Sequence, residues 1–509
     1  METITIYIDG QPRSAELGRK LYQYLPAEHP CGGHGICGKC KVTVTGVLPE
    51  PDTNERRLLQ PEELEAGVRL ACSMRIAGPC WVTTRWNHSE HQSRIVTHGE
   101  MPRIDLDPAF SGYGAAIDIG TTTLAAKLFD GRGQLLGQTS CANPQAFWGA
   151  DVISRIEAAI KGNAERLQSA VREALTEMLC ALAHQAGIQT EEIDGLVITG
   201  NTVMLSLLTG TSMESLSRAP FTMNRAFGEC LRAGELGLHV LRNDAHVYLP
   251  ACIGAFVGAD TVCALLASRL CETAETKLLV DIGTNGELCL WHKGVLYAAS
   301  TAAGPAFEGV GIQMGMQAEP GAIDRVQRKN GELQVHAVGD VSPRGICGSG
   351  LIDAVAELLE SEQIDETGFL ENAPFRLTET VFLTQRDIRM VQLAKSAICA
   401  GIHTLMKAAG ISEENVQETV IAGGFGHYLD IGNAVRIGLF PKALEAGIRS
   451  AGNAALAGAA MLLLNRKLRQ SCQLLAAKAQ VITLSENPVF TQAYTMGMWF
   501  PEKDREGSL

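Results

Sequence analysis

The sequence predicts a multidomain α+β protein, in which a small, strand-rich N-terminal domain precedes a larger α/β domain of two lobes. Three observations predict this organisation. The chain has 509 residues, too many for one hydrophobic core. Three cysteines lie in a glycine-rich run near the N-terminus, beside short stretches of alternating polarity. Further along, an apolar stretch that ends in Asp-Ile-Gly-Thr occurs twice.

Composition and charge narrow the class of protein. Hydrophobic residues make up 46% of the chain and charged residues 19%, as in ordinary globular proteins. The formal net charge of −13 argues against binding to nucleic acid or to acidic membranes. No apolar stretch reaches the roughly 18 residues of a membrane helix. The N-terminus alternates like a strand and lacks the pattern of a signal peptide. We expect a cytoplasmic enzyme.

The first element is the cysteine cluster. The chain has 15 cysteines, an odd number scattered along its length, which does not indicate a secreted disulfide framework. Most of them, Cys180 and Cys263 among them, lie in apolar surroundings that favour burial. Four differ, because three share one glycine-rich loop in a C-x5-C-x2-C pattern and the fourth follows in Leu-Ala-Cys: Cys31, Cys37, Cys40 and Cys72.

This spacing predicts a 2Fe–2S cluster. Plant-type ferredoxins use C-x4-C-x2-C with a distant fourth cysteine, so the first gap here is one residue longer. The loop glycines let three thiolates converge on two irons. The flanking stretches Thr3–Ile8 and 41–45 alternate as strands, and 62–67 indicates a short helix or turn. Residues 1–85 therefore outline a β-grasp ferredoxin, with Cys80 as a fifth, buried cysteine. Structural zinc is the alternative, although zinc sites usually have paired C-x2-C motifs.

Residues 86–112 are polar, rich in histidine and contain two prolines, so they predict a linker.

The repeated turn is the next element. Asp118 ends the first apolar strand, and Asp281 ends the second in the same pattern. A repeated strand–turn–strand predicts two related lobes that face one another. The small residues of each turn offer backbone N–H groups to a phosphate, and each aspartate can hold a hydrated magnesium ion. No GxxxxGK[ST] motif occurs in the chain, so the site is not a P-loop.

A third element completes the nucleotide pattern. An apolar strand leads into the pair Gly423 and Gly424, where the backbone can pass close to a flat ligand such as adenine or ribose. We expect the first lobe at 113–275 and the second lobe, with a C-terminal extension, at 276–509. Helices are predicted around Leu167–Leu182, where leucines recur at helical spacing, and at 388–408.

These three elements resemble the phosphate-1, phosphate-2 and adenosine motifs of the actin/Hsp70/sugar-kinase superfamily. Further motifs resemble the reductive activators of corrinoid enzymes, which carry an N-terminal iron–sulfur domain and a C-terminal ATPase of this superfamily. The motifs that carry this resemblance are Gly149–Ile156, Thr199–Thr202, Phe256–Asp260, Ala302–Gly309, Gly345–Gly350 and Asp387–Arg389. The resemblance covers nearly the whole chain and implies a two-lobed α/β ATPase after the ferredoxin.

The resemblance implies a role for each site residue. Asp118 and Asp281 would position Mg²⁺, and Asp151 and Glu308 are candidates for polarising the attacking water. The structural alternative for these two is a turn or helix-capping residue. Ser300 and Thr301 would face the corrinoid protein. The remaining residues would contact phosphates or adenosine: Gly120, Thr121, Thr122, Gly283, Thr284, Asn285, Gly423 and Gly424.

The resemblance also implies the reaction. The expected function is ATP-dependent delivery of one electron from the 2Fe–2S cluster to a corrinoid protein of a methyltransferase or demethylase system, which reduces Co(II) to Co(I). A low-potential electron donor would supply the electron, and the oligomeric state is not predicted. Two alternatives stay open: an actin-fold small-molecule kinase with an accessory ferredoxin, and a redox-sensing ATPase.

Overall fold

A computed structural model describes residues 3–25, 35, 38, 40–84 and 99–502. The chain divides into two compact units. The first unit contains Met1–His91 and Asn143–Val171, and the second contains Gln92–Ala142 and Arg172–Leu509. Each unit is described by itself.

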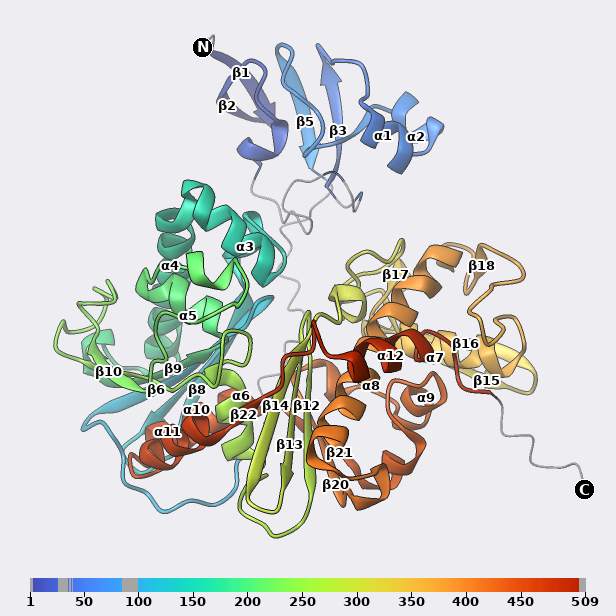
Figure 1. The fold of residues 1–509 in the computed structure, drawn as a ribbon. Coiled ribbons are helices and arrows are strands. Elements are labelled where there is room, and N and C mark those ends of the chain that lie inside the picture. The colour runs from blue at the N-terminus through green and yellow to red at the C-terminus, as the bar shows by residue number, and fades with distance from the viewer. Residues whose placement is uncertain (1–2, 26–34, 36–37, 39, 85–98, 503–509) are drawn as a thin grey trace, which may run out of the picture. The chain divides into compact units, whose positions relative to one another are not determined.

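The first unit is built around a five-stranded sheet with the strand order β2-β1-β5-β3-β4 (Figure 1). Strands β1 and β5 are parallel, and the other neighbours are antiparallel. The elements are β1 (Thr3–Ile8), β2 (Gln11–Glu16), β3 (Lys41–Gly46), α1 (Thr53–Leu58), α2 (Pro61–Glu65), β4 (Val68–Leu70) and β5 (Cys80–Thr84). The predicted ferredoxin domain is confirmed, including the strand at Thr3–Ile8.

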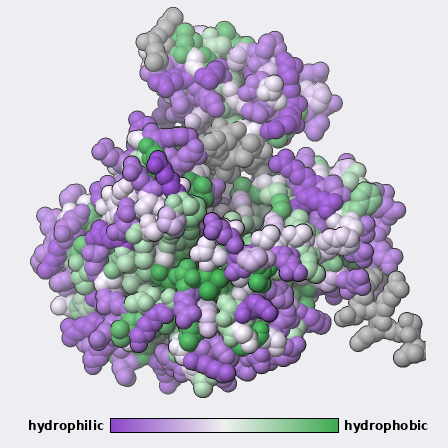
Figure 2. Space-filling model, viewed as in Figure 1, coloured by the Kyte–Doolittle hydropathy of each residue, from purple (hydrophilic) through white to green (hydrophobic). Residues whose placement is uncertain are grey.

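Alternation along the strands explains the core of this domain. Ile6, Ile8, Val42 and Val44 are buried on one face while their neighbours are exposed or half-buried. Cys80 is fully buried in β5 and belongs to the same core, as predicted. On the face drawn in Figure 2, hydrophilic residues cover most of the visible surface of this domain.

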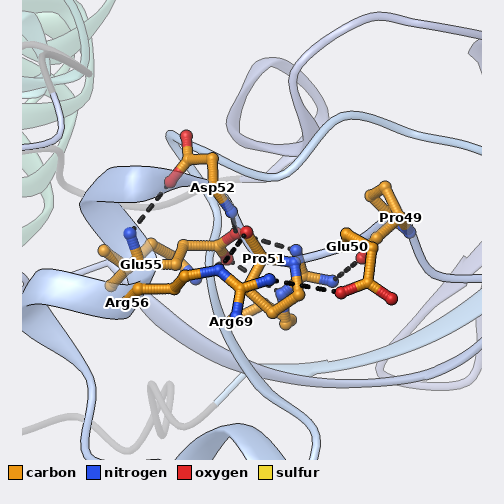
Figure 3. Close-up of polar contacts among 8 residues, drawn as sticks. Pro49, Glu50, Pro51, Asp52, Glu55, Arg56 and Arg69 are labelled. Carbon is orange, nitrogen blue, oxygen red and sulfur yellow. Dashed lines mark hydrogen bonds and ion pairs between the residues drawn. The ribbon is translucent and has the colours of Figure 1, made fainter.

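A buried ion pair ties α1 to β4 (Figure 3). The Arg69 guanidinium donates to both carboxylate oxygens of Glu55, with Nε–Oε1 2.9 Å and Nη2–Oε2 2.7 Å. Glu55 is 0% exposed and Arg69 3%. The backbone N–H of Leu70 also donates to Glu55, and Arg69 donates to the Pro49 carbonyl. The buried charges are therefore paired and hydrogen-bonded, as burial requires.

The second unit contains two six-stranded sheets (Figure 1), in which five consecutive strands pair in the same parallel and antiparallel pattern and the sixth strand, β10 or β22, is added at opposite edges. Their strand orders are β10-β11-β9-β6-β7-β8 and β21-β20-β12-β13-β14-β22. In each sheet the strand that ends in the predicted aspartate, β6 or β12, pairs parallel with one neighbour and antiparallel with the next. The internal repeat predicted from the two Asp-Ile-Gly-Thr turns is thus a repeat of sheet architecture.

The strands that end in the two predicted turns and the strand that leads into Gly423 are among those of the two sheets. The first sheet contains β6 (Tyr113–Ile119), β7 (Thr123–Asp130), β8 (Leu135–Ala142), β9 (Ile193–Gly200), β10 (Glu229–Arg232) and β11 (His246–Leu249). The second contains β12 (Lys277–Ile282), β13 (Gly286–His292), β14 (Val295–Thr301), β20 (Glu418–Ala422), β21 (Ile448–Gly452) and β22 (Gln480–Val481). A small sheet joins β15 (Ala322–Lys329), β16 (Glu332–Ala337) and β17 (Gly345–Ile346), and β18 (Phe375–Arg376) pairs with β19 (Phe382–Leu383).

Helices cover these sheets and complete two large cores. One core joins side chains of both six-stranded sheets with helices α6 and α10. The other gathers the second sheet, α7 and α8. Helix α3 (Val152–Ala158) and the start of α4 (Ala164–Ala186) belong to the first unit. The rest of α4 and the following helices belong to the second unit: α5 (Thr202–Thr209), α6 (Ala259–Ala267), α7 (Gly348–Glu360), α8 (Gln385–Ala409), α9 (Ile431–Arg436), α10 (Ala454–Leu464), α11 (Leu468–Lys478) and α12 (Pro488–Met496). Helices α4 and α8 contain the two predicted helical stretches.

The end of the described chain packs along α8. Gln392 Nε2 donates to the Met498 carbonyl at 2.6 Å, and Ser396 Oγ donates to the Tyr494 carbonyl. Lys395 is 1% exposed, donates to the Trp499 carbonyl and lies 4.8 Å from the centre of the Phe500 ring. Burial lowers the pKa of Lys395 to about 8. Carbonyl and aromatic partners thus solvate this buried ammonium group.

The described part of the predicted linker is attached to the second unit. Gly99 forms an isolated bridge with Gly452, and Asp107 N–H donates to the Leu464 carbonyl at 2.9 Å. Asp107 also forms an ion pair with Arg466.

Cysteine burial was predicted only in part, since Cys263 is buried as expected whereas Cys180 is exposed. Among the described residues, no helix is long and apolar enough to cross a membrane.

Candidate functional site

Two turns of the second unit carry the repeated aspartates. The first follows β6, and Gly120 N–H closes it by donating to the Thr123 carbonyl at 2.9 Å. The second follows β12, where Gly283 N–H donates to the Asn285 carbonyl at 3.1 Å. Each turn reverses the chain into the next antiparallel strand, so each aspartate stands at the end of its strand.

One cavity of about 310 Å³ brings the two turns together with the glycine motif. It is lined by most of the residues predicted from the sequence, namely Asp118, Gly120, Thr121, Thr122, Asp281, Gly283, Thr284, Asn285, Glu308, Gly423 and Gly424. A cavity of this volume, with polar groups that converge on it, is typical of a small-molecule site.

Five half-buried carboxylates line this cavity: Glu308 and a group of four formed by Asp118, Asp260, Asp281 and Glu287. Loss of hydration, followed by the charge of Asp260, raises the pKa of Asp118 to about 7 and that of Asp281 to about 7. Loss of hydration raises the pKa of Asp260 to about 6. It also raises the pKa of Glu287 well above its usual range, with Asp260 and Asp281 adding to the effect. The cavity therefore disfavours the ionised forms of these carboxyl groups, through burial and through their closeness to one another.

Residues from the C-terminal half support each aspartate differently. Asn453 Nδ2 donates to Asp118 Oδ2 at 3.1 Å, while its Oδ1 caps α10 through Leu456 N–H. Gly423 lies against Asp281 with a φ of +87°, and a Cβ at this glycine would come within 2.6 Å of Asp281 Oδ1. Only glycine fits there without displacing the carboxylate.

Among the described residues, no three acidic, cysteine or histidine side chains are grouped so that they could hold a metal ion by themselves, so a cation in this cavity would also need ligands from phosphate or water. Within the described residues, no lysine or arginine forms an ion pair with any of the four carboxylates. Carboxylate oxygens are the ligands that Mg²⁺ prefers, and a bound cation would relieve their repulsion. Asn201 Nδ2 donates to Thr121 Oγ1 at 3.1 Å and orders the first turn.

The other predicted site residues lie in different settings. Asp151 is the N-cap of α3, and its carboxylate accepts from Ser154 N–H at 2.8 Å. Ser300 and Thr301 end strand β14 rather than a loop, and Thr301 is 4% exposed. Ser300 Oγ donates to Glu287 at 3.4 Å. Neither Ser300 nor Thr301 lines the cavity. Their expected role toward a corrinoid protein stays a prediction.

The cysteine site is described in part, because Cys31 and Cys37 lie outside the described residues. Cys40 and Cys72 are buried and close together, and Cys72 N–H donates to Cys40 Sγ at 3.4 Å. Gly35 has a φ of +69°, and a Cβ there would meet the Asn54 side chain at 2.7 Å. The adjacent sulfurs of Cys40 and Cys72, one of which accepts a backbone N–H, are compatible with two ligands of an iron–sulfur cluster.

Sequence reasoning missed three site residues. Asp260 ends the motif Phe256–Asp260 but was given no role, and Glu287 follows the second turn, where an acidic residue so close to the turn was the available signal. Asn453 gave no local signal, because it lies 335 residues from Asp118 along the chain.

Comparisons with known proteins agree with this geometry. The model of the 2Fe-2S iron-sulfur cluster binding domain matches residues 6–77. The model of the RACo middle region matches 113–273, and that of the C-terminal domain of RACo, the ASKHA domain, matches 275–508.

Relatives match over most of the chain. It is 35% identical to the corrinoid activation enzyme RamQ of Eubacterium limosum, over 76% of this chain and 70% of the relative. It is 27% identical to the [Co(II) methylated amine-specific corrinoid protein] reductase of Methanosarcina barkeri, over 70% of each. A solved reductive activator for corrinoid, iron-sulfur protein has a TM-score of 0.72 and 26% identity, covering 98% of this chain and 99% of that one. The chain therefore belongs to the family of reductive activators of corrinoid proteins.

Proposed function

We propose that this protein is an ATP-dependent reductase that returns a corrinoid protein from Co(II) to Co(I). The carrying observation is the cavity between the two phosphate turns, where four carboxylates meet hydroxyl and glycine groups suited to a nucleotide. The ferredoxin domain in the same chain supports an electron-transfer role for that nucleotide. The names of the relatives support a corrinoid protein as the partner, here one of a methyltransferase or demethylase system.

Each group has a defined task in this proposal. When bound, a 2Fe–2S cluster supplies one electron, which a low-potential donor replaces. Cys40 and Cys72, with Cys31 and Cys37, would hold that cluster. Cobalt gains the electron, so the reaction balances as a one-electron transfer. Asp118 and Asp281 would position Mg²⁺, while a set of small residues would contact the nucleotide: Gly120, Thr121, Thr122, Gly283, Thr284, Asn285, Gly423 and Gly424.

Energy explains why an ATPase is needed. A plant-type cluster has a potential near about −400 mV. If Co(II) reduction lies roughly 200 mV lower, the transfer is uphill by about 4–5 kcal/mol. Binding or hydrolysis of ATP can supply energy of that order by favouring another conformation of the complex.

The division of the chain follows from this proposal. We assign residues 1–85 to the ferredoxin, 86–112 to a linker, 113–275 to the first ATPase lobe and 276–509 to the second lobe with its C-terminal extension. The two six-stranded sheets support the two lobes. Helix α10 of the C-terminal part packs against β6 and β9 of the first sheet, so the lobes share a core.

Anaerobic reduction of a candidate corrinoid protein tests the proposal. The chain, a titanium(III) reductant and the Co(II) protein are mixed with and without Mg-ATP, and the Co(I) absorption band is followed. We expect the band only with ATP and only when Cys40 is intact, with Cys40→Ala as the variant. The same rate without ATP, or in Cys40→Ala, would show that the proposed reaction is wrong. Metal analysis should find about two irons per chain, and stoichiometric zinc with little iron would contradict the cluster.

A further inference from the structure

One carboxylate joins the two phosphate turns. Thr122 Oγ1 donates to Glu308 Oε2 at 2.9 Å, and Thr284 Oγ1 donates to Glu308 Oε1 at 2.8 Å. Thr122 belongs to the turn after β6 and Thr284 to the turn after β12. Glu308 thus accepts one hydroxyl hydrogen bond from each sheet's turn, with one carboxylate oxygen for each.

These two hydroxyls are the donors that a nucleotide would need. A phosphoryl group and a carboxylate both present anionic oxygens that accept hydrogen bonds, so they compete for the same donors. Phosphoryl transfer requires charge on the terminal phosphoryl group to be stabilised from more than one side. The point where hydroxyls of both turns converge is suited to that group, and Glu308 occupies it.

The segment that carries Glu308 contacts several parts of the cavity, so displacement of the Glu308 carboxylate by a phosphate would affect them. The short helix Pro305–Glu308 lies between Gly304 and Gly309, whose φ values are +78° and +77°. Gly304 N–H donates to the Thr284 carbonyl at 3.0 Å. Phe307 stacks on Phe425, next to the adenosine glycines, with ring centres 5.3 Å apart. The segment therefore touches both phosphate turns and the glycine motif.

We propose that Glu308 is a sensor of the nucleotide's terminal phosphate. Its carboxylate links Thr122 to Thr284, and the terminal phosphoryl group of ATP takes over both hydroxyls and releases it. ADP lacks that group and leaves the link closed. This inference rests on the proposed use of ATP, and it assigns to Glu308 a role in the nucleotide-dependent conformation rather than in polarising water.

Nucleotide affinity in matched variants tests the inference. Dissociation constants for ADP and for a non-hydrolysable ATP analogue are measured with Mg²⁺ by calorimetry in the parent, Glu308→Ala and Glu308→Gln. Removing the competitor should tighten binding of the analogue about tenfold in Glu308→Ala and less in Glu308→Gln. ADP affinity should change by less than about twofold, which also shows that the cavity is folded. Glu332→Gln, at an exposed position of β16, removes the same charge elsewhere and should change neither constant.

The other outcomes contradict the proposal. Unchanged or weaker binding of the analogue in both variants would mean that Glu308 serves catalysis or structure. The same conclusion would follow if the variants lost ATP hydrolysis while their affinity for the analogue stayed at the parent value. Equal tightening of ADP and analogue would reflect charge alone. If the parent protein bound neither nucleotide, the proposed use of ATP would be wrong. That result is distinct from a difference in affinity between the parent and the variants, which tests the role of Glu308.

Discussion

The two units of this protein place acidic side chains away from water in opposite ways. In the ferredoxin domain, the fully buried Glu55 is paired with Arg69 through two hydrogen bonds and accepts a third from a backbone N–H group. In the cavity of the second unit, Asp118, Asp260 and Asp281 lie near one another with raised pKa values. No cationic side chain among the described residues forms an ion pair with these three.

The paired carboxylate of the first unit has a structural role, whereas the carboxylates of the cavity are suited to binding another species. A carboxylate that is neutralised within the fold holds two elements together and needs nothing further. A group of carboxylates that the fold leaves without a counter-charge is costly unless another species completes it. The comparison therefore predicts stability effects in the first unit and nucleotide-dependent effects in the second.

The largest effect is expected at the phosphate turns. If the proposed function is right, Asp281→Ala should lower ATP hydrolysis by at least about a hundredfold, because Asp281 would position the Mg²⁺ of bound ATP, directly or through water. The visible spectrum of the ferredoxin domain should not change. ATP-stimulated corrinoid reduction, measured with the cluster reduced beforehand, should stop.

Asp244→Ala is the control, because Asp244 is exposed, lies outside the cavity and forms an ion pair with the neighbouring Arg242. Corrinoid reduction at the parent rate in Asp281→Ala, with hydrolysis lost, would show that the two activities are not coupled.

The second effect is expected in the ferredoxin domain. Glu55→Gln leaves the Arg69 guanidinium buried without its counter-charge, which should destabilise this domain by about 3 kcal/mol. Chemical unfolding followed through the visible chromophore measures the change. Glu50→Gln is the matched control, since that side chain is 92% exposed and its pair with Arg56 should contribute little. Equal stability of the two variants would mean that the buried pair does not hold the domain together.

A third, smaller effect depends on pH. Asp353 is buried on α7, accepts from Asn433 Nδ2 at 2.8 Å, and has a pKa raised by burial from 3.8 to about 6. A raised folded-state pKa gives stability that is present below pH 3.8 and is lost as the pH rises through 6. Between pH 4.5 and 7.5 the parent should lose about 2 kcal/mol relative to Asp353→Asn. Urea unfolding at both pH values checks this, and parallel pH profiles of the two proteins would contradict it.

The smallest effect is expected from a change that removes support from only one of the two turns. Asn453→Ser keeps an N-cap for α10 but is too short to donate to Asp118, so the first turn alone loses support. ATP affinity should fall about five- to tenfold, since one hydrogen bond to a charged group is lost. The thermal midpoint of unfolding should stay close to the parent value. Unchanged ATP affinity would mean that Asn453 only caps the helix.

Local chemistry explains what the sequence could predict. The apolar stretches, the turns and the cysteine spacing each depend on a few neighbouring residues, so β6, β12 and the ferredoxin sheet were predicted. The two Asp-Ile-Gly-Thr turns line one cavity as expected. Gly423 was predicted as a ligand contact, but its closeness to Asp281 depends on the parallel pairing of β12 with β20.

Tertiary contacts explain what the sequence could not predict. The hydrogen bond from Asn453 to Asp118 needs the C-terminal part to return to the first sheet. The link through Glu308 joins residues that are 186 positions apart, at Thr122, and 24 positions apart, at Thr284. Asp151 was a candidate for polarising water, and its carboxylate caps α3, which was the structural alternative.

The packing of the chain's last described residues along α8 limits how the protein can be shortened for experiments. Lys395 depends on the Trp499 carbonyl and the Phe500 ring, and Gln392 depends on the Met498 carbonyl. An expression version that stops before Tyr494 would expose one side of α8 and leave a buried ammonium group without its acceptor. Such a version would be a poor test of the isolated ATPase, because a folding defect would mimic a loss of activity. Truncations and fusions should therefore retain residues through Phe500.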